Sequence, residues 1–277
     1  MTIIYLYRSL AALGGVERIF IDKANYLAEH YGYHVYIITW EQGGHSIVYP
    51  LSPKVTHVDW GILFYRQYQY GLFKRMFMQW KMEKEFFKKL SNFVHTTQAD
   101  IVIEASCEFT TMAGMDLLQR KTHTILETHS MRTSIEKNNP PAGNLLMRWA
   151  FKRRDKQLHQ YIKHMSAFVT LTHNDAKDWS DITPQARIIP NMLHRYPAEI
   201  SPDKKTQKRI ITAGRLVEQK GYDLLLDAWS KVHQKHPEWI LDIYGEGEDK
   251  TMLLEKRKNL ALENSVLFHP PLSLIHI

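Results

Sequence analysis

Two basic side chains stand five positions apart in the segment AGRLVEQKG, residues 213–221. Arg215 and Lys220 are flanked by Gly214 and Gly221, between a short apolar run and a stretch, YDLLLDAW, with the apolar spacing of a helix. A planar guanidinium and a mobile ammonium at the end of a strand suit the oxygens of a diphosphate. The same pair could also be two solvated loop charges, and spacing alone leaves both interpretations open.

A second loop with adjacent glycines lies near the N-terminus. Gly14 and Gly15 separate the apolar run at 3–7 from a helix-patterned stretch. Glycines at this place let the backbone approach a phosphate or carboxylate at the positive end of a helix, or they serve a tight turn with a positive φ. The pattern is not G-x-G-x-x-G, and Glu41 is the only acid after the second apolar run, so a dinucleotide site is not indicated.

Two single residues are weaker candidates. His129 ends the apolar run ILETH, but the chain has 15 histidines, most of which must be incidental. Cys107 is the only cysteine, which excludes an internal disulfide, fits a reducing compartment and suggests a core position.

Composition indicates a globular protein. Of the 277 residues 44% are hydrophobic and 23% charged, and the net charge is +7. The N-terminus lacks the features of a signal peptide, and no apolar run approaches bilayer-spanning length, so we expect a cytoplasmic protein, with docking on a membrane surface as the alternative. The charge fits nucleic acid, anionic lipid or an anionic substrate, and the lack of a nucleic-acid-binding motif disfavours the first.

Strand-like and helix-like segments alternate along the chain. Strands are expected at 3–7, 34–40, 55–60, 99–105, 122–129, 167–172 and 186–190, with helices between most of them, and the cycle restarts near 209. This order predicts an α/β protein with two doubly wound, Rossmann-like domains. The polar stretch 192–208 contains two prolines and is predicted to be a linker between domains at 1–191 and 209–271.

A long helical stretch at 70–97 mixes Phe, Met and Trp with Lys and Arg, and 148–156, RWAFKRRDK, adds basic charge. Its apolar face could pack on the sheet with the lysines solvated, which is the simpler expectation. It could also lie on anionic lipid.

Four segments in order resemble the family 4 glycosyltransferases, nucleotide-sugar enzymes of the two-domain GT-B fold. They are GGVERI (14–19), IIPN (188–191), TAGRLVEQKGYDLLLDAW (212–229) and LDIYGEGEDKTML (241–253). The resemblance covers nearly all of residues 1–271. It departs from the family pattern after Asn191, where Met192 and His194 stand in place of a glycine and a nearby acid.

The resemblance implies a retaining glycosyltransferase that moves a sugar from a nucleoside diphosphate sugar to a glycan or lipid-linked acceptor, in surface polysaccharide synthesis. Arg215 and Lys220 would hold the diphosphate, and His129 would contact the transferred sugar. No metal and no cofactor are implied. The remaining substrate-binding residues would be Gly14, Gly15, Asn191, Gly214, Gly245 and Gly247. The alternatives are a non-catalytic protein that binds a nucleotide sugar or membrane glycolipid, and a nucleotide-sugar epimerase.

The last six residues, LSLIHI at 272–277, match the translation of a transposase-based sequencing adapter. We expect them to be a non-native tail after a partial C-terminal nucleotide-sugar-binding domain at 209–271. Family members carry a further stretch here, with a Glu-x7-Glu pair that contacts the donor. The 277-residue chain is therefore expected to be an inactive fragment that binds donor weakly and tends to aggregate.

Overall fold

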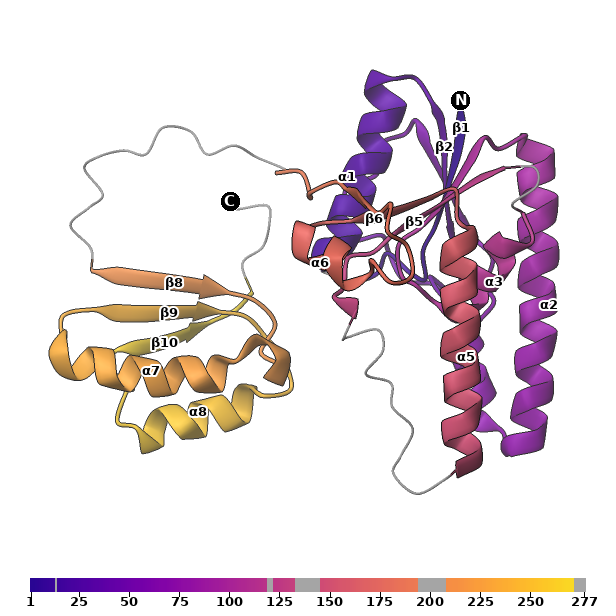
Figure 1. Ribbon diagram of the computed structural model, residues 1–277. Coiled ribbons are helices and arrows are strands. Elements are labelled where there is room, and N and C mark those ends of the chain that lie inside the picture. Colours follow the sequence, from indigo (N-terminus) through magenta and orange to yellow (C-terminus); the bar gives the residue numbers. More distant parts are fainter. Residues whose placement is uncertain (13, 119–121, 133–144, 194–207, 272–277) are drawn as a thin grey trace. The chain divides into compact units, whose positions relative to one another are not determined.

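The computed structural model describes residues 1–12, 14–118, 122–132, 145–193 and 208–271 (Figure 1). The chain divides into two compact units, Met1–Arg195 and Tyr196–Ile277. Most of the expected linker, including His194, and all of the expected tail at 272–277 lie outside the described residues.

The first unit is built on a parallel sheet of seven strands in the order β3-β2-β1-β4-β5-β6-β7. The order reverses direction between β1 and β4, and ligands of such sheets bind beside the carboxyl ends of the strands at this point. The strands are β1 (Thr2–Leu6), β2 (His34–Thr39), β3 (Val55–Asp59), β4 (Ile101–Glu104), β5 (His123–Glu127), β6 (Ala167–Thr170) and β7 (Arg187–Ile188). The predicted α/β class with parallel sheets is confirmed.

Helices cover both faces of this sheet. The helices are α1 (Gly15–His30), α2 (Leu72–Thr97), α3 (Phe109–Asp116), α5 (Leu145–His164) and α6 (His173–Asp178), with a 3-10 helix η1 (Phe64–Gln69) before α2. Alternate strand residues point to opposite faces, so Ile3 and Tyr5 pack against α1 while Ile4 and Leu6 pack against α2. None of the described helices has an apolar stretch long enough to cross a membrane.

Helix α2 only partly fits the expectation that its apolar face packs on the sheet. Its buried residues, Phe86, Leu90 and Val94, all lie in its second half. The packing expectation therefore holds from Met82 onward and is wrong for Leu72–Trp80.

The second unit has a parallel sheet of three strands in the order β10-β9-β8. Both described helices of this unit lie on one face of the sheet (Figure 1). Asp242, buried on β9, accepts hydrogen bonds from Arg209 on β8 and His269 on β10 and so ties the three strands together. The elements are β8 (Arg209–Ala213), a 3-10 helix η3 (Glu218–Lys220), α7 (Tyr222–Lys235), β9 (Ile240–Tyr244), α8 (Lys250–Asn259) and β10 (Val266–His269).

Candidate functional site

The loop after β8 is closed against the loop after β9. The amides of Gly214 and Leu216 each donate a hydrogen bond of 2.9 Å to a carbonyl of the β9 end. A Cβ atom at Gly245 would lie 2.0 Å from the Gly214 carbonyl oxygen, and one at Gly247 would lie 2.2 Å from that of Leu216. Gly245 and Gly247 therefore allow the two backbones to meet, and this contact fixes the course of the loop that carries Arg215.

Arg215 and Lys220 project from this fixed loop into solvent. Leu216 between them is fully buried in the core of the second unit, and the Lys220 amide donates to the Val217 carbonyl at 2.9 Å. Gly221 has φ +66°, which favours glycine, and turns the chain into α7. Within the described parts of the chain, neither cationic side chain has an ion pair or hydrogen bond. The loop thus presents two unpaired cations at the carboxyl edge of a parallel sheet.

Gly14 and Gly15 occupy the equivalent place in the first unit, between β1 and α1. Gly14 has φ −117° and Gly15 begins the helix, so the interpretation of a turn that needs a positive φ is wrong. No side chain caps the first amides of α1, and the Tyr49 hydroxyl donates to the Gly14 carbonyl at 3.1 Å. A Cβ at Gly15 would meet nothing within 4 Å. The loop therefore leaves open space beside Gly15 and, among the described residues, N–H groups without a side-chain cap. A Cβ at Gly14 would instead lie 2.0 Å from the carboxylate of Glu17, so the loop carries an acid rather than a cation.

His129 follows β5 in a buried polar group. Its side chain is 4% exposed, and its Nε2 lies 3.6 Å from the Glu127 carboxylate, which is long for a hydrogen bond. Neither ring nitrogen has a hydrogen-bond partner among the described residues. Lys23 of α1 donates to Glu127 at 2.8 Å. Burial alone would raise the pKa of Glu127, but His129 and Lys23 together lower it.

Asn191 is exposed beyond β7, and no contact of its side chain is present in the part of the chain that the structure describes. Gly14, Gly15, His129 and Asn191 follow the carboxyl ends of β1, β5 and β7, which lie at one edge of the parallel sheet. The residues predicted from sequence thus form two groups, one in each unit.

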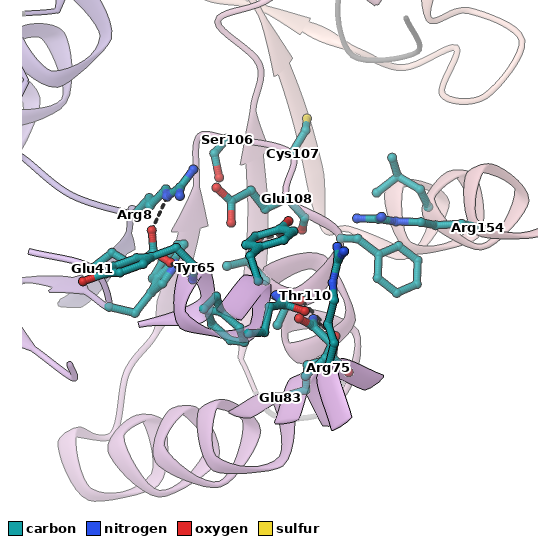
Figure 2. Close-up of a pocket in the computed structure, with 18 of the residues that line it drawn as sticks. Arg8, Glu41, Tyr65, Arg75, Glu83, Ser106, Cys107, Glu108, Thr110 and Arg154 are labelled. Carbon is teal, nitrogen blue, oxygen red and sulfur yellow. Dashed lines mark hydrogen bonds and ion pairs between the residues drawn. The ribbon is translucent and has the colours of Figure 1, made fainter. Parts of the chain in front are cut away.

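A pocket of about 870 Å³ lies at the same edge of the first unit (Figure 2). Its walls come from the loops after β1, β2 and β4 and from η1, α2, α3 and α5. Aromatic and charged side chains face it together, including Arg8, Tyr65, Arg75, Glu108 and Arg154. Neither the Gly14–Gly15 loop nor His129 lines it, although Ser130, next to His129, does. An open pocket with mixed aromatic and polar walls suits a polar ligand with apolar faces, such as a saccharide.

Glu104, at the end of β4, organises the loop beneath this pocket. Its buried carboxylate accepts hydrogen bonds from the amides of Ser106 and Cys107, both at 2.9 Å, and from the hydroxyls of Ser106 and Thr111. Cys107 adopts φ +55°, a conformation rare for residues other than glycine. Burial raises the pKa of Glu104, and these hydrogen bonds counter part of that effect.

Glu108 faces the pocket from this loop (Figure 2). Burial and the nearby Glu104 raise the pKa of Glu108 to about 7, although Arg8 and Arg154 oppose the shift. Arg8 itself is paired with Glu41, and the guanidinium of Arg154 lies 5.0 Å from the ring centre of Phe109. Glu108 can therefore hold or release a proton near neutral pH.

Arg8, Glu104 and Glu108 are not among the site residues predicted from the sequence. Single charges that follow different strands form no spacing motif, because the fold alone brings them together. One signal was available: IVIEA places an acid inside an otherwise apolar strand, and a carboxylate in such a strand needs partners.

Comparison with known proteins points to one family. Residues 198–276 match the family described as "Glycosyl transferases group 1". An uncharacterized glycosyltransferase of Haemophilus influenzae is 26% identical over 274 residues, which cover 96% of this chain and 68% of that protein. The amylovoran biosynthesis glycosyltransferase AmsD of Erwinia amylovora is 46% identical over 75 residues, 27% of this chain and 20% of that protein.

The fold is shared with solved structures. TarM of Staphylococcus aureus, solved as a mutant in complex with fondaparinux, α-GlcNAc-glycerol and UDP, superposes with a TM-score of 0.67. The match covers 98% of this chain and 77% of the TarM chain at 11% identity, so it supports a shared fold and nothing further.

Proposed function

We propose that the chain is a group 1 glycosyltransferase with the GT-B fold and that it transfers a sugar from a nucleoside diphosphate sugar to a glycan or lipid-linked acceptor, with retention of configuration. The observation that carries this proposal is the pair of unpaired cations on the loop after β8, which lies within the residues that match the family.

On the donor side, Arg215 and Lys220 bind the diphosphate. As the bond between the sugar and the diphosphate breaks, negative charge grows on the departing phosphate, and the two cations stabilise it. Gly214, Gly245 and Gly247 hold the loop in place, so the cations need little reorganisation at the moment of reaction. In this proposal residues 209–271 carry the nucleotide-sugar-binding chemistry.

In the first unit, residues 1–191 serve the acceptor and the sugar. Gly14 and Gly15 leave room beside the uncapped end of α1 for donor oxygens. His129, whose ring nitrogens make no hydrogen bond with the described residues, contacts hydroxyls of the transferred sugar. Asn191 contributes a further polar contact.

The acceptor occupies the pocket of about 870 Å³ in this proposal. Its aromatic walls provide faces for sugar rings, and its charged groups provide hydrogen bonds. The similarity to AmsD, named for amylovoran biosynthesis, favours a role in surface polysaccharide synthesis, in the cytoplasm.

The test uses a panel of labelled nucleotide sugars with the 277-residue chain. A nucleotide sugar that binds only the folded protein raises its apparent stability, by about 2.7 kcal/mol at a hundredfold excess over Kd. We expect stabilisation by one class of nucleotide sugar and by its nucleoside diphosphate. Transfer of label to an acceptor would identify an enzyme and overturn the expectation that the 277-residue chain is an inactive fragment, whereas release of an epimerised sugar would indicate an epimerase. Stabilisation by no member of the panel contradicts the proposal.

A further inference from the structure

The first half of α2 extends beyond the core. From Leu72 to Glu85 no residue is buried, whereas Phe86, Leu90 and Val94 pack on the sheet. At 1.5 Å per residue these 14 residues form about 20 Å of helix, in which Met82 packs, partly buried, against the core and the exposed apolar side chains lie before it. A soluble helix normally buries its apolar residues, so this half needs another explanation.

The unburied half carries large apolar side chains. Phe73 is 87% exposed and Trp80 51% exposed. Residues 73, 76, 77 and 80 recur at helical spacing and therefore share one face of α2. We call this set the α2 patch: Leu72, Phe73, Met76, Phe77 and Trp80. Five exposed apolar side chains on three helical turns form a contiguous surface rather than scattered exposure.

Helix α5 has the same organisation. The side chains of Arg148, Trp149 and residues 152–157 are exposed, and Ile162 in the last turn is buried. Trp149 is 61% exposed, with the Arg153 guanidinium 5.5 Å from its ring centre. Both helices precede strands of one parallel sheet, so both begin at the carboxyl edge of that sheet.

The positive charge of the protein is concentrated on these two helices. Together α2 and α5 contain 12 Lys and Arg against 3 Asp and Glu, while the rest of the chain has 24 against 26. Basic groups also accompany the exposed rings: the Lys84 Nζ lies 3.9 Å from the ring centre of Trp80. Exposed aromatic and aliphatic side chains surrounded by lysine and arginine are typical of surfaces that enter the headgroup region of a bilayer.

The charge distribution also decides between two occupants of this surface. A second copy of the chain would bring two strongly positive surfaces together, and like charges repel. An anionic bilayer instead complements the charge and accepts the apolar side chains.

We propose that the first halves of α2 and α5 dock on an anionic lipid bilayer and present the pocket of the first unit to the headgroup region. The pocket borders the α2 patch, because Arg75 and Gln79 line it from α2, and Arg154 and Leu158 line it from α5. An acceptor whose saccharide enters this pocket can keep its lipid in the bilayer. The acceptor is therefore a lipid-linked saccharide, a conclusion that rests on the proposed transferase function, whereas docking itself does not.

The test is flotation of the 277-residue chain with vesicles of phosphatidylcholine, with and without phosphatidylglycerol. We expect binding to the anionic vesicles that weakens as salt rises from about 0.05 M to about 0.5 M, because screening shortens the range of surface charges. Phe73→Ser with Phe77→Ser should weaken binding at least about tenfold. Lys81→Glu with Lys84→Glu should weaken it more than about a hundredfold, since each basic residue near an anionic surface contributes about fivefold.

The controls replace residues of the same types elsewhere. Leu117→Ser changes another exposed apolar side chain of the first unit, 70% exposed, and Lys235→Glu reverses a charge on α7. Both should leave flotation unchanged. Absence of binding to anionic vesicles, equal binding to neutral vesicles, or wild-type binding by the double Phe variant would overturn the proposal. A dimer that the double Phe variant converts to monomers would assign the α2 patch to a second copy and also overturn it.

Flotation tests docking, and stabilisation by nucleotide tests the proposed function, so the two proposals can fail independently. The four variants should retain the stabilisation by nucleoside diphosphate, because their positions lie outside the loop after β8. If vesicles bind as expected while no nucleotide stabilises the chain, the proposed function fails and docking stands. The reverse result rejects docking and leaves the donor site intact.

Discussion

The loops after β1 and after β8 occupy equivalent places, each between the first strand and the first helix of its unit, but they differ in chemistry. The first has two glycines, open space and an acid in the first turn of its helix. The second has two cations with no ion pair among the described residues, and Gly245 and Gly247 of the loop after β9 hold it by close backbone contact. A glycine loop alone supplies room and N–H groups, and we expect diphosphate binding to depend on the positive charge that the loop after β8 adds.

The largest effect should come from the glycines of the second unit. Gly247→Ala places a Cβ 2.2 Å from the Leu216 carbonyl oxygen and forces the two loops apart. We expect it to destabilise the second unit by about 3 kcal/mol. Gly15→Ala, where a Cβ meets nothing within 4 Å, should change stability by less than about 1 kcal/mol. Urea unfolding, with hydrogen exchange of the β8–β10 amides, measures both, and equal effects would remove the contrast between the loops.

The next effect concerns Glu108, whose pKa is raised to about 7. A raised pKa in the folded state means that stability is present below the unfolded pKa and is lost as pH rises through about 7. The Gln side chain of Glu108→Gln cannot ionise. The free energy of unfolding of this variant should therefore match that of the wild type within about 1 kcal/mol at pH 5 and exceed it by up to about 3 kcal/mol at pH 8. Denaturant titrations at the two pH values measure both free energies. If the difference between the two proteins is the same at pH 5 and pH 8, the raised pKa of Glu108 is contradicted.

A smaller effect should follow at Glu127. Its pKa is lowered, whereas that of Glu108 is raised, because His129 and Lys23 outweigh the effect of burial. Lys23→Met should destabilise the first unit by about 2 kcal/mol at pH 7, because it leaves a largely buried carboxylate without its lysine. A lowered pKa gives stability that is present above the unfolded pKa and lost as pH falls through the folded one. The cost of the variant should therefore shrink in acid, and a cost independent of pH would contradict the pairing.

The smallest effect should come from Glu17. If the loop after β1 supplies mainly space, Glu17→Gln should change the affinity for the nucleoside diphosphate by less than about threefold, the scale of one charge near a helix end. Isothermal titration measures the affinity. A much larger gain would show that the end of α1 is itself a principal anion site.

The sequence predicts the strands and the loop after β8 because their signals are local. Apolar runs such as those of β1 and β9, and the flanking glycines of Arg215 and Lys220, can be recognised without knowing what lies nearby. The pocket could not be predicted, because Arg8 and Glu108 stand about a hundred positions apart and meet only when β1 pairs with β4. The two halves of α2 have similar composition, and only the extent of the sheet decides that Phe86 is buried and Phe73 exposed.

The most direct measurement is an NMR titration of the 277-residue chain with the nucleoside diphosphate that stabilises it, which detects weak binding as well as strong. We expect shifts of the amides from Gly214 to Gly221 that saturate with this ligand, are lost in Arg215→Ala with Lys220→Ala, and persist in the control Lys235→Ala. Each lost charge-assisted contact should weaken binding by about tenfold or more. Undiminished shifts in the double variant, or shifts that exclude this loop, would contradict the assignment of the diphosphate to Arg215 and Lys220.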